Sequence, residues 1–409
     1  MSVKKKSNLL IFLCWFIYTA AYCSRYSYTA NVASITAHYG LLNADAGLVS
    51  TCFFFIYGAG QIVNGLLCKR YPKRLLLALA LLTSSVVNIV LAFGIPFSYF
   101  KYLWLVNGLA QSFLWSSLIL ILGENLSSTD LRKAVFIMST TVMVGTTLSY
   151  GVSALFTRFG SFFGAFAFGG AVTAIAATVW FFFYPQAVSG KTEELITQNK
   201  EAQERGKIPT AVLVTAILLA AFAVADNFVK DGLITWVPSI LIDQYGVSES
   251  LSVFVTLFLP VVAIVGTTAV SQLHKKIPSF VLLCGLFFLI SSVFLGGVLL
   301  LLETPQWVLV LICFCFVSCC MSGINNVITG MAPLYLRKHV NPGLLSGLLD
   351  GCCYVGSALS SYGLGAFSDL FGWGKSFYLL LGVCLVPVVC SIALAAVSRK
   401  KPKEGEKTE

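Results

Sequence analysis

Arg25 and Lys230 are the residues of this chain whose type and position most clearly predict chemistry. Each lies inside a long apolar segment, and they are 205 positions apart. An ionised side chain near the centre of a bilayer costs roughly 2.5 to 3.5 kcal/mol on insertion scales, so a functional role is expected for it. A guanidinium offers a planar pair of donors, and an ammonium offers a point charge. Together they predict a site for a small dianion, with phosphate as the natural candidate.

The composition predicts that transmembrane helices position these two residues. Apolar residues make up 57% of the chain, charged residues make up 11%, and the mean hydropathy is +0.86. A soluble domain is about 25% charged. A span needs about 20 apolar residues, and a helix satisfies its backbone hydrogen bonds within one segment. The sequence supplies twelve such segments: 9–37, 46–68, 75–96, 100–123, 134–156, 162–184, 210–242, 250–273, 279–302, 306–335, 344–368 and 375–397.

Basic residues between the predicted spans indicate the orientation of the chain. One side carries 22 of them, whereas the other carries only Lys101, Arg158 and Lys375. Because basic loops stay in the cytoplasm, both termini are expected there. The asymmetry also explains the net charge of +10. The expected partner of these charges is the lipid bilayer, and no nucleic-acid partner is predicted.

An internal repeat organises the spans. Sliding the sequence on itself by 205 positions places Arg25 on Lys230 and Gly151 on Gly356. The predicted divisions are a six-helix half over 1–184, a cytoplasmic linker over 185–209, a second six-helix half over 210–397 and a cytoplasmic tail over 398–409. We therefore predict an all-α integral membrane protein with twelve transmembrane helices in two pseudo-symmetric halves, the major facilitator fold. Its binding site is expected near the membrane midplane, between the halves.

Other polar residues within the spans are candidates for the same site. Tyr57 and Gln61 lie one helical turn apart, and so do Asp350 and Tyr354. Hydroxyl and amide groups at such positions could complete the contacts of an anion. The predicted binding set is Arg25, Lys230, Tyr28, Tyr57, Gln61, Asn325, Asp350 and Tyr354.

Three carboxylates leave the role of Lys230 open. Asp226 lies one turn before Lys230 on the same helix face, and Asp231 is its neighbour in sequence. An intrahelical ion pair could neutralise the lysine without any ligand. Asp350 could pair with Lys230, take up a proton or contact a cationic part of the substrate. Asp226, Asp231 and Asp350 are therefore candidates for charge pairing or proton coupling.

Several motifs resemble those of the organophosphate:phosphate antiporters, a family that includes the bacterial glycerol-3-phosphate transporter and the glucose-6-phosphate transporter of the endoplasmic reticulum. Residues 22–28, Tyr-Cys-Ser-Arg-Tyr-Ser-Tyr, resemble the first-helix motif. Residues 230–238 resemble the seventh-helix motif, a basic residue followed by Gly and Trp-x-Pro. Residues 107–111 are similar to the fourth helix, and residues 343–373 are similar to the eleventh helix and its following loop.

The resemblance implies exchange of a phosphorylated metabolite for inorganic phosphate, with Arg25 and Lys230 at the phosphate-binding positions. The sequence departs from the glycerol-phosphate branch at Gln61 and Val142, where that branch has a lysine and a histidine. These differences concern the identity of the substrate, including its phosphate group.

We expect a secondary active transporter that works by alternating access in a cell membrane, the bacterial inner or plasma membrane, and functions as a monomer. One alternative is a proton-coupled symporter of an organic carboxylate such as a sugar acid, with Asp350 or Asp226 carrying the proton. Another is a transporter-like ligand sensor. No enzyme activity is predicted, because the loops hold no nucleophile and base pair. No metal or cofactor is predicted, because cysteines and histidines lack metal-site spacing.

Overall fold

The computed structural model describes residues 3–67, 71–188, 208–336, 339–340 and 342–400. Within these ranges the chain folds as helices and short turns, with no strand. The helices are α1 (Val3–Thr29), α2 (Val32–Tyr39), α3 (Asn43–Leu67), α4 (Lys73–Ala92), η1 (Phe97–Tyr99), α5 (Phe100–Ser112), α6 (Leu114–Asn125), α7 (Ser128–Arg158), α8 (Phe163–Ala187), α10 (Thr210–Tyr245), α11 (Glu249–Thr256), α12 (Phe258–Leu273), α13 (Phe280–Leu301), α14 (Trp307–Asn326), η3 (Val327–Met331), α15 (Ala332–Tyr335), α16 (Pro342–Phe371) and α17 (Trp373–Lys400).

Each predicted span corresponds to one helix or to two or three consecutive helices of this bundle. Ten of these spans in the described part of the chain are long and apolar enough to cross a membrane. The other two are α3 and α16, which carry many small and polar residues and pack against each other. Small residues let two helices approach closely within a membrane.

Two of the spans are interrupted beside a proline. The break between α11 and α12 falls at Leu257, three residues before Pro260. The π-helical turn η3 ends at Met331, two residues before Pro333. A proline inside a helix removes one backbone donor and clashes with the preceding turn. A single π turn is a common way to absorb such a clash.

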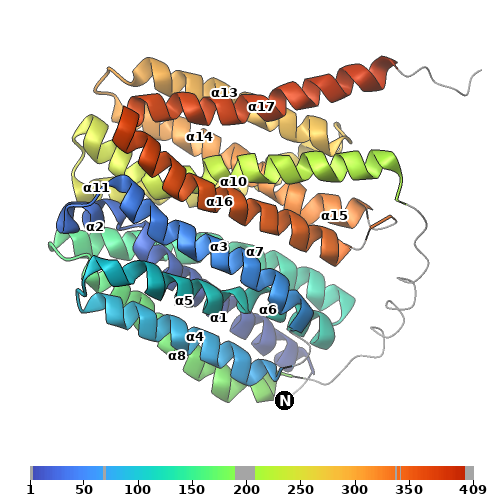
Figure 1. Cartoon of the computed structure of the whole chain (residues 1–409). Coiled ribbons are helices and arrows are strands. Elements are labelled where there is room, and N and C mark those ends of the chain that lie inside the picture. Colours follow the sequence, from blue (N-terminus) through green and yellow to red (C-terminus); the bar gives the residue numbers. More distant parts are fainter. Residues whose placement is uncertain (1–2, 68–70, 189–207, 337–338, 341, 401–409) are drawn as a thin grey trace, which may run out of the picture.

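The bundle consists of two groups of helices (Figure 1). Helices α1 to α8, blue to green, occupy the lower part of the view, whereas α10 to α17, yellow-green to red, occupy the upper part. In the first group α1 packs against α7 and α8; in the second α13 packs against α14 and α17. Helix α8 continues to Ala187, three residues into the predicted linker, and α10 begins at Thr210, the first residue of the predicted second half. The predicted linker otherwise lies mostly outside the described residues.

The two halves meet through α3 with α16 and through α7 with α11. We call the end where α1 begins and α17 ends the terminal end, and the opposite end the far end (Figure 1). Within the described ranges, six hydrogen bonds involving side chains join the halves. All six come from the far-end portions of their helices, and their donors are Asn43 N, Asn43 Nδ2, Ala44 N, Thr51 Oγ1, Tyr150 OH and Ser250 Oγ.

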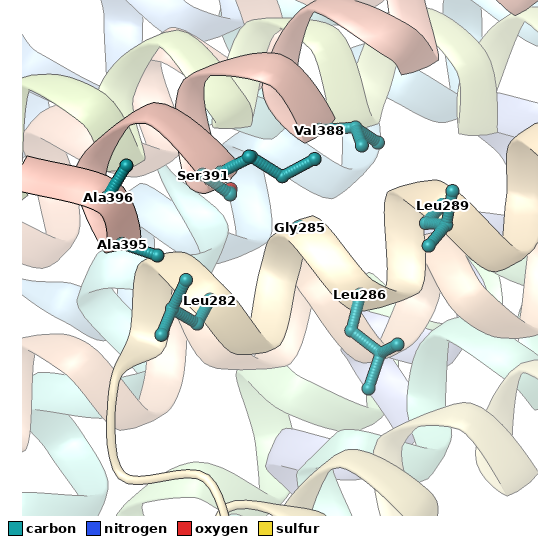
Figure 2. A pocket seen from close by; sticks show the side chains of 9 residues that line it. Leu282, Gly285, Leu286, Leu289, Val388, Ser391, Ala395 and Ala396 are labelled. Carbon is teal, nitrogen blue, oxygen red and sulfur yellow. The ribbon is translucent and has the colours of Figure 1, made fainter. Parts of the chain in front are cut away.

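A crevice of about 390 Å³ lies between α13 and α17 on the outside of the second half. Figure 2 shows its aliphatic lining, with Leu282, Leu286 and Leu289 on α13 and Val388 on α17. Its lining includes no charged side chain. It therefore offers nothing to an anion, and the candidate site lies elsewhere.

Candidate functional site

Arg25 is buried in an aromatic enclosure in the middle of the first half. Its side chain is only 4% exposed, and it forms no ion pair among the described residues. The guanidinium carbon lies 4.7 Å from the ring centre of Tyr22, 5.0 Å from that of Phe53 and 4.3 Å from that of Tyr57. The ring faces attract the cation without neutralising it. Arg25 therefore keeps a full positive charge for another partner.

Gln111 on α5 holds the guanidinium in place. Arg25 Nε donates to Gln111 Oε1 at 3.1 Å, while Arg25 Nη2 is buried with no hydrogen-bond partner. The amide of Gln111 is itself fixed, because its Nε2 lies 2.9 Å from Ser24 Oγ, 3.0 Å from Ser84 Oγ and 3.2 Å from Asn107 Oδ1. One edge of the guanidinium is thus anchored and the other remains available to a ligand.

Helix α3 adds two more hydrogen-bonding groups beside Arg25. The hydroxyl of Tyr57 is buried without a partner, and so is the Nε2 group of Gln61 one turn further along. Gln61 Oε1 accepts a hydrogen bond of 3.4 Å from Ser116 Oγ, which turns the amide so that its donor is the unused group. A buried polar group without a partner is costly, so such groups mark places where a ligand or water is expected.

Lys230 lies on α10 in the second half and is already engaged. Its Nζ donates to Asn227 Oδ1 at 2.8 Å and lies 3.9 Å from Asp231 Oδ1. Asp231 in turn accepts a hydrogen bond from Ser357 of α16. The intrahelical ion pair anticipated from the sequence is therefore present, with Asp231 as the partner. An anion would have to compete with Asp231 for this lysine.

The two cations face a common region between the halves. Tyr22 and Asp350 each lie within electrostatic range of both Arg25 and Lys230. Across the same region, the rings of Tyr57 and Tyr354 approach to 4.7 Å between centres. The packing thus brings Arg25, Tyr57 and Tyr354 of the predicted set into one cluster, with Asp350 in electrostatic range of Arg25 and Lys230.

Two residues of the predicted set have other contacts. Tyr28 is fully buried, donates its hydroxyl to Ala46 O at 2.8 Å and packs against Trp104. It does not join the groups around Arg25, because its hydroxyl already donates to a backbone carbonyl of α3. Asn325 lies on α14, where its Nδ2 is 3.6 Å from Cys353 Sγ. It faces the Lys230 side of the region rather than the Arg25 side.

The sequence prediction did not include Gln111, Tyr22 and Ser357 in the site. Gln111 belongs to the segment that resembles the fourth helix of the antiporters, and Tyr22 is about one turn before Arg25 on the same face. Both could therefore have been predicted as site residues from the sequence. Ser357 carried none, because a serine in a membrane helix most often bonds to its own backbone. Its link to Asp231 depends on how α16 packs against α10.

Residues 14–341 match the Major Facilitator Superfamily. The chain belongs to that superfamily. Its all-helical fold agrees with solved structures of transporters. One is a bacterial homologue of the human lysosomal transporter Spinster in an inward-facing and occupied conformation, with a TM-score of 0.76, 16% identity and coverage of 96% of this chain and 97% of that chain. A D-xylose–proton symporter gives a TM-score of 0.72 at 13% identity, covering 96% and 97% of the two chains.

Within the Major Facilitator Superfamily, the sequence is similar to proteins named for sugar phosphates. It is 22% identical over 417 residues to a probable hexose phosphate transport protein of Chlamydia pneumoniae, covering 93% of this chain and 90% of that protein. It is 20% identical over 403 residues to sugar phosphate exchanger 3 of Homo sapiens, covering 86% and 80%. These likenesses agree with the resemblance to organophosphate:phosphate antiporters.

A shorter likeness has higher identity. Over 103 residues the chain is 31% identical to the membrane sensor protein UhpC of Escherichia coli, which is 25% of this chain and 23% of that protein. The matched part thus spans less than a quarter of the length of this relative.

Proposed function

We propose that this superfamily member exchanges a small phosphorylated metabolite for inorganic phosphate by alternating access. The observation that carries the proposal is the set of unused groups around Arg25. The guanidinium keeps one free edge, and Tyr57 and Gln61 offer a hydroxyl and an amide donor beside it. A charged donor combined with neutral donors suits the several oxygens of a phosphate group. The names of the full-length relatives support the same substrate class.

The proposed orientation places the terminal end in the cytoplasm, as the distribution of basic residues predicts. Under that orientation the hydrogen bonds at the far end close the outer side of the site. The structure would then be an inward-facing conformation, with the site open toward the cytoplasm. Reorientation requires these contacts to break while the halves close at the terminal end, with the two halves moving as the units 1–184 and 210–397.

The decisive experiment measures exchange in proteoliposomes. Vesicles loaded with inorganic phosphate should take up labelled phosphate rapidly, and vesicles without internal anion should not. Exchange is expected because the buried guanidinium of Arg25 has no ion-pair partner among the described residues, so a bound anion lowers the cost of closing the site around it. Uptake that is independent of internal anion would contradict obligatory exchange.

Substitution of Arg25 tests the site itself. Arg25→Ala should abolish phosphate exchange, because it removes the only cation of the region that has no ion pair among the described residues. Arg158→Ala is the matched control, because Arg158 is exposed at the end of α7. The control should exchange phosphate like the parent. Equal exchange by the Arg25 variant and the parent would overturn the assignment.

Ligand sensing is a second candidate function, favoured by the similarity to the membrane sensor UhpC. A sensor would use the same groups to bind the anion but would not need to move it across the membrane. Binding of phosphate or a hexose phosphate to the purified protein, measured by thermal shift, would then occur without exchange in vesicles. Binding accompanied by exchange would support the transporter instead.

A further inference from the structure

Asp226 is a buried carboxylate that the proposed anion site does not use. It lies on α10 and is 0% exposed. Its Oδ1 atom is buried without a hydrogen-bond partner, its Oδ2 accepts a hydrogen bond of 3.2 Å from the side chain of Asn227, and the amide of Asn325 approaches the carboxylate from α14. Among the described residues, no cation lies within 4.0 Å of it.

The groups that face Asp226 do not balance its charge. On its own helix, Lys230 lies one turn away, but the ammonium bonds to Asn227 and pairs with Asp231. The other helices packed around it present thiols and one amide: Cys284 of α13, Asn325 of α14, Cys353 of α16 and Cys384 of α17. A carboxylate in such surroundings is far more easily accommodated as the neutral acid.

The charge count of the whole region leads to the same conclusion. Arg25 and Lys230 bring two positive charges, whereas Asp226, Asp231 and Asp350 would bring three negative charges if all were ionised. Asp231 already has both Lys230 and Ser357 as partners. A region with net negative charge would repel a phosphate group. A proton on Asp226 removes that excess.

We propose that Asp226 is a proton-binding site and that the anion binds to the form of the protein in which Asp226 is protonated. The step is a simple protonation: a proton from the surrounding water forms an O–H bond on the carboxylate, and nothing is oxidised or reduced. When Asp226 loses this proton, its charge draws Lys230 away from the anion. The inference rests on the proposed phosphate-binding function and adds a proton to it.

Linkage gives the expected behaviour. Because the anion prefers the protonated form, its affinity should fall as the pH rises through the titration of Asp226. A single linked proton weakens binding by about tenfold for each pH unit above that point. By reciprocity, phosphate binding should be accompanied by proton uptake in the same range.

The first test is infrared spectroscopy of the purified protein, which needs no ligand. The parent should show a carbonyl stretching band of a protonated carboxyl group, and Asp226→Asn should lack it. Asp130→Asn, at the surface-exposed start of α7, is the matched control and should keep the band. Identical carboxyl bands in the parent and the Asp226 variant would overturn the proposal.

The second test measures binding of inorganic phosphate over a range of pH. Phosphate itself gains and loses protons as the pH changes. The effect of Asp226 is therefore read from the difference in pH dependence between the parent and the variant. The parent should lose an additional factor of about ten per pH unit relative to Asp226→Asn. The same pH dependence in both proteins would overturn the inference. A parent that binds no phosphate at any pH would contradict the proposed function instead, and the infrared band would still decide the protonation of Asp226.

Discussion

At the scale of single residues, the availability of Arg25 depends on an uncharged neighbour. Gln111 accepts from Nε and leaves Nη2 free, so the guanidinium is oriented without losing its charge. A carboxylate at the same place would pair with the arginine and compete with any anion. The polar network behind Gln111, formed with Ser24, Ser84 and Asn107, fixes the direction of its amide.

Gln111→Ala should therefore weaken phosphate binding while leaving the charge of Arg25 intact. A hydrogen bond to a charged group contributes about 1.5 to 3 kcal/mol, so we expect a rise of roughly tenfold or more in the phosphate concentration for half-maximal exchange. Gln111→Glu should weaken binding further, because its carboxylate neutralises Arg25. The concentration dependence of exchange in proteoliposomes measures both effects.

Asn64→Ala provides the control for Gln111. Asn64 is a buried amide of the same half, but it bonds to the backbone carbonyls of Ser112 and Phe113 and does not contact Arg25. Its loss should lower thermal stability without changing the half-maximal phosphate concentration. A parallel shift in half-maximal concentration for Asn64→Ala and Gln111→Ala would mean that Gln111 acts only through stability.

At the scale of the helices, close crossings determine which residues are tolerated. Gly266 of α12 lies directly against α14, where an added Cβ would stand 1.7 Å from the carbonyl oxygen of Cys319. Gly323 of α14 lies at the same crossing, 3.0 Å from Gly266 O by the same measure. Van der Waals packing of small residues is the main source of helix association in a membrane, so this crossing stabilises the second half.

Gly266→Ala should consequently lower the stability of the protein. The methyl group forces α12 and α14 apart, and overpacking of this kind typically costs about 1 to 3 kcal/mol. The midpoint of thermal unfolding in detergent measures the loss. Gly296→Ala in α13 is the matched control, because its Cβ would meet nothing within 4 Å. Equal midpoints for the two variants would contradict the importance of this crossing.

At the scale of the whole molecule, one contact joins the halves by capping a helix of one with a carboxylate of the other. Asp369, near the end of α16, accepts from the backbone N–H groups of Asn43 and Ala44 at 3.0 and 2.7 Å. These two residues begin α3, and a negative charge at a helix start is favourable. We call this arrangement the far-end cap. It must break whenever the halves separate at the far end.

Asp369→Asn should make the far end open more often. Loss of a helix cap costs about 0.5 to 2 kcal/mol, which corresponds to amide exchange faster by between about twofold and thirtyfold in the affected segments. Hydrogen–deuterium exchange of peptides covering residues 43–51 and 358–369 measures it. Peptides at the terminal end should be unchanged.

Asp243→Asn is the control for the far-end cap. Asp243 lies in the far-end part of α10 but accepts from Trp373 Nε1 within the second half. Its substitution should not accelerate exchange at residues 43–51. Acceleration by both variants alike would show that the far end is sensitive to any lost carboxylate rather than to separation of the halves.

Much of this protein could be predicted from the sequence, because membrane insertion leaves a strong signal in single residues. Long apolar segments predicted the positions of the helices, and the cost of an ionised side chain in lipid singled out Arg25 and Lys230. The 205-residue repeat placed these two residues in equivalent positions of two halves. These properties follow from the chain's interaction with lipid, which each residue type determines locally.

The tertiary structure decided which of these polar groups are free. Helix packing makes the hydroxyl of Tyr28 donate to Ala46 O and pairs Lys230 with Asp231 and Asn227. It leaves Nη2 of Arg25 without a hydrogen-bond partner. It also joins Ser357 to Asp231 and leaves Asp226 with no cation within 4.0 Å in the described part of the chain, although both aspartates stand close to the same lysine in sequence. The physical reason is that hydrogen bonding depends on distances and directions between different helices. Residue spacing along one helix does not determine them.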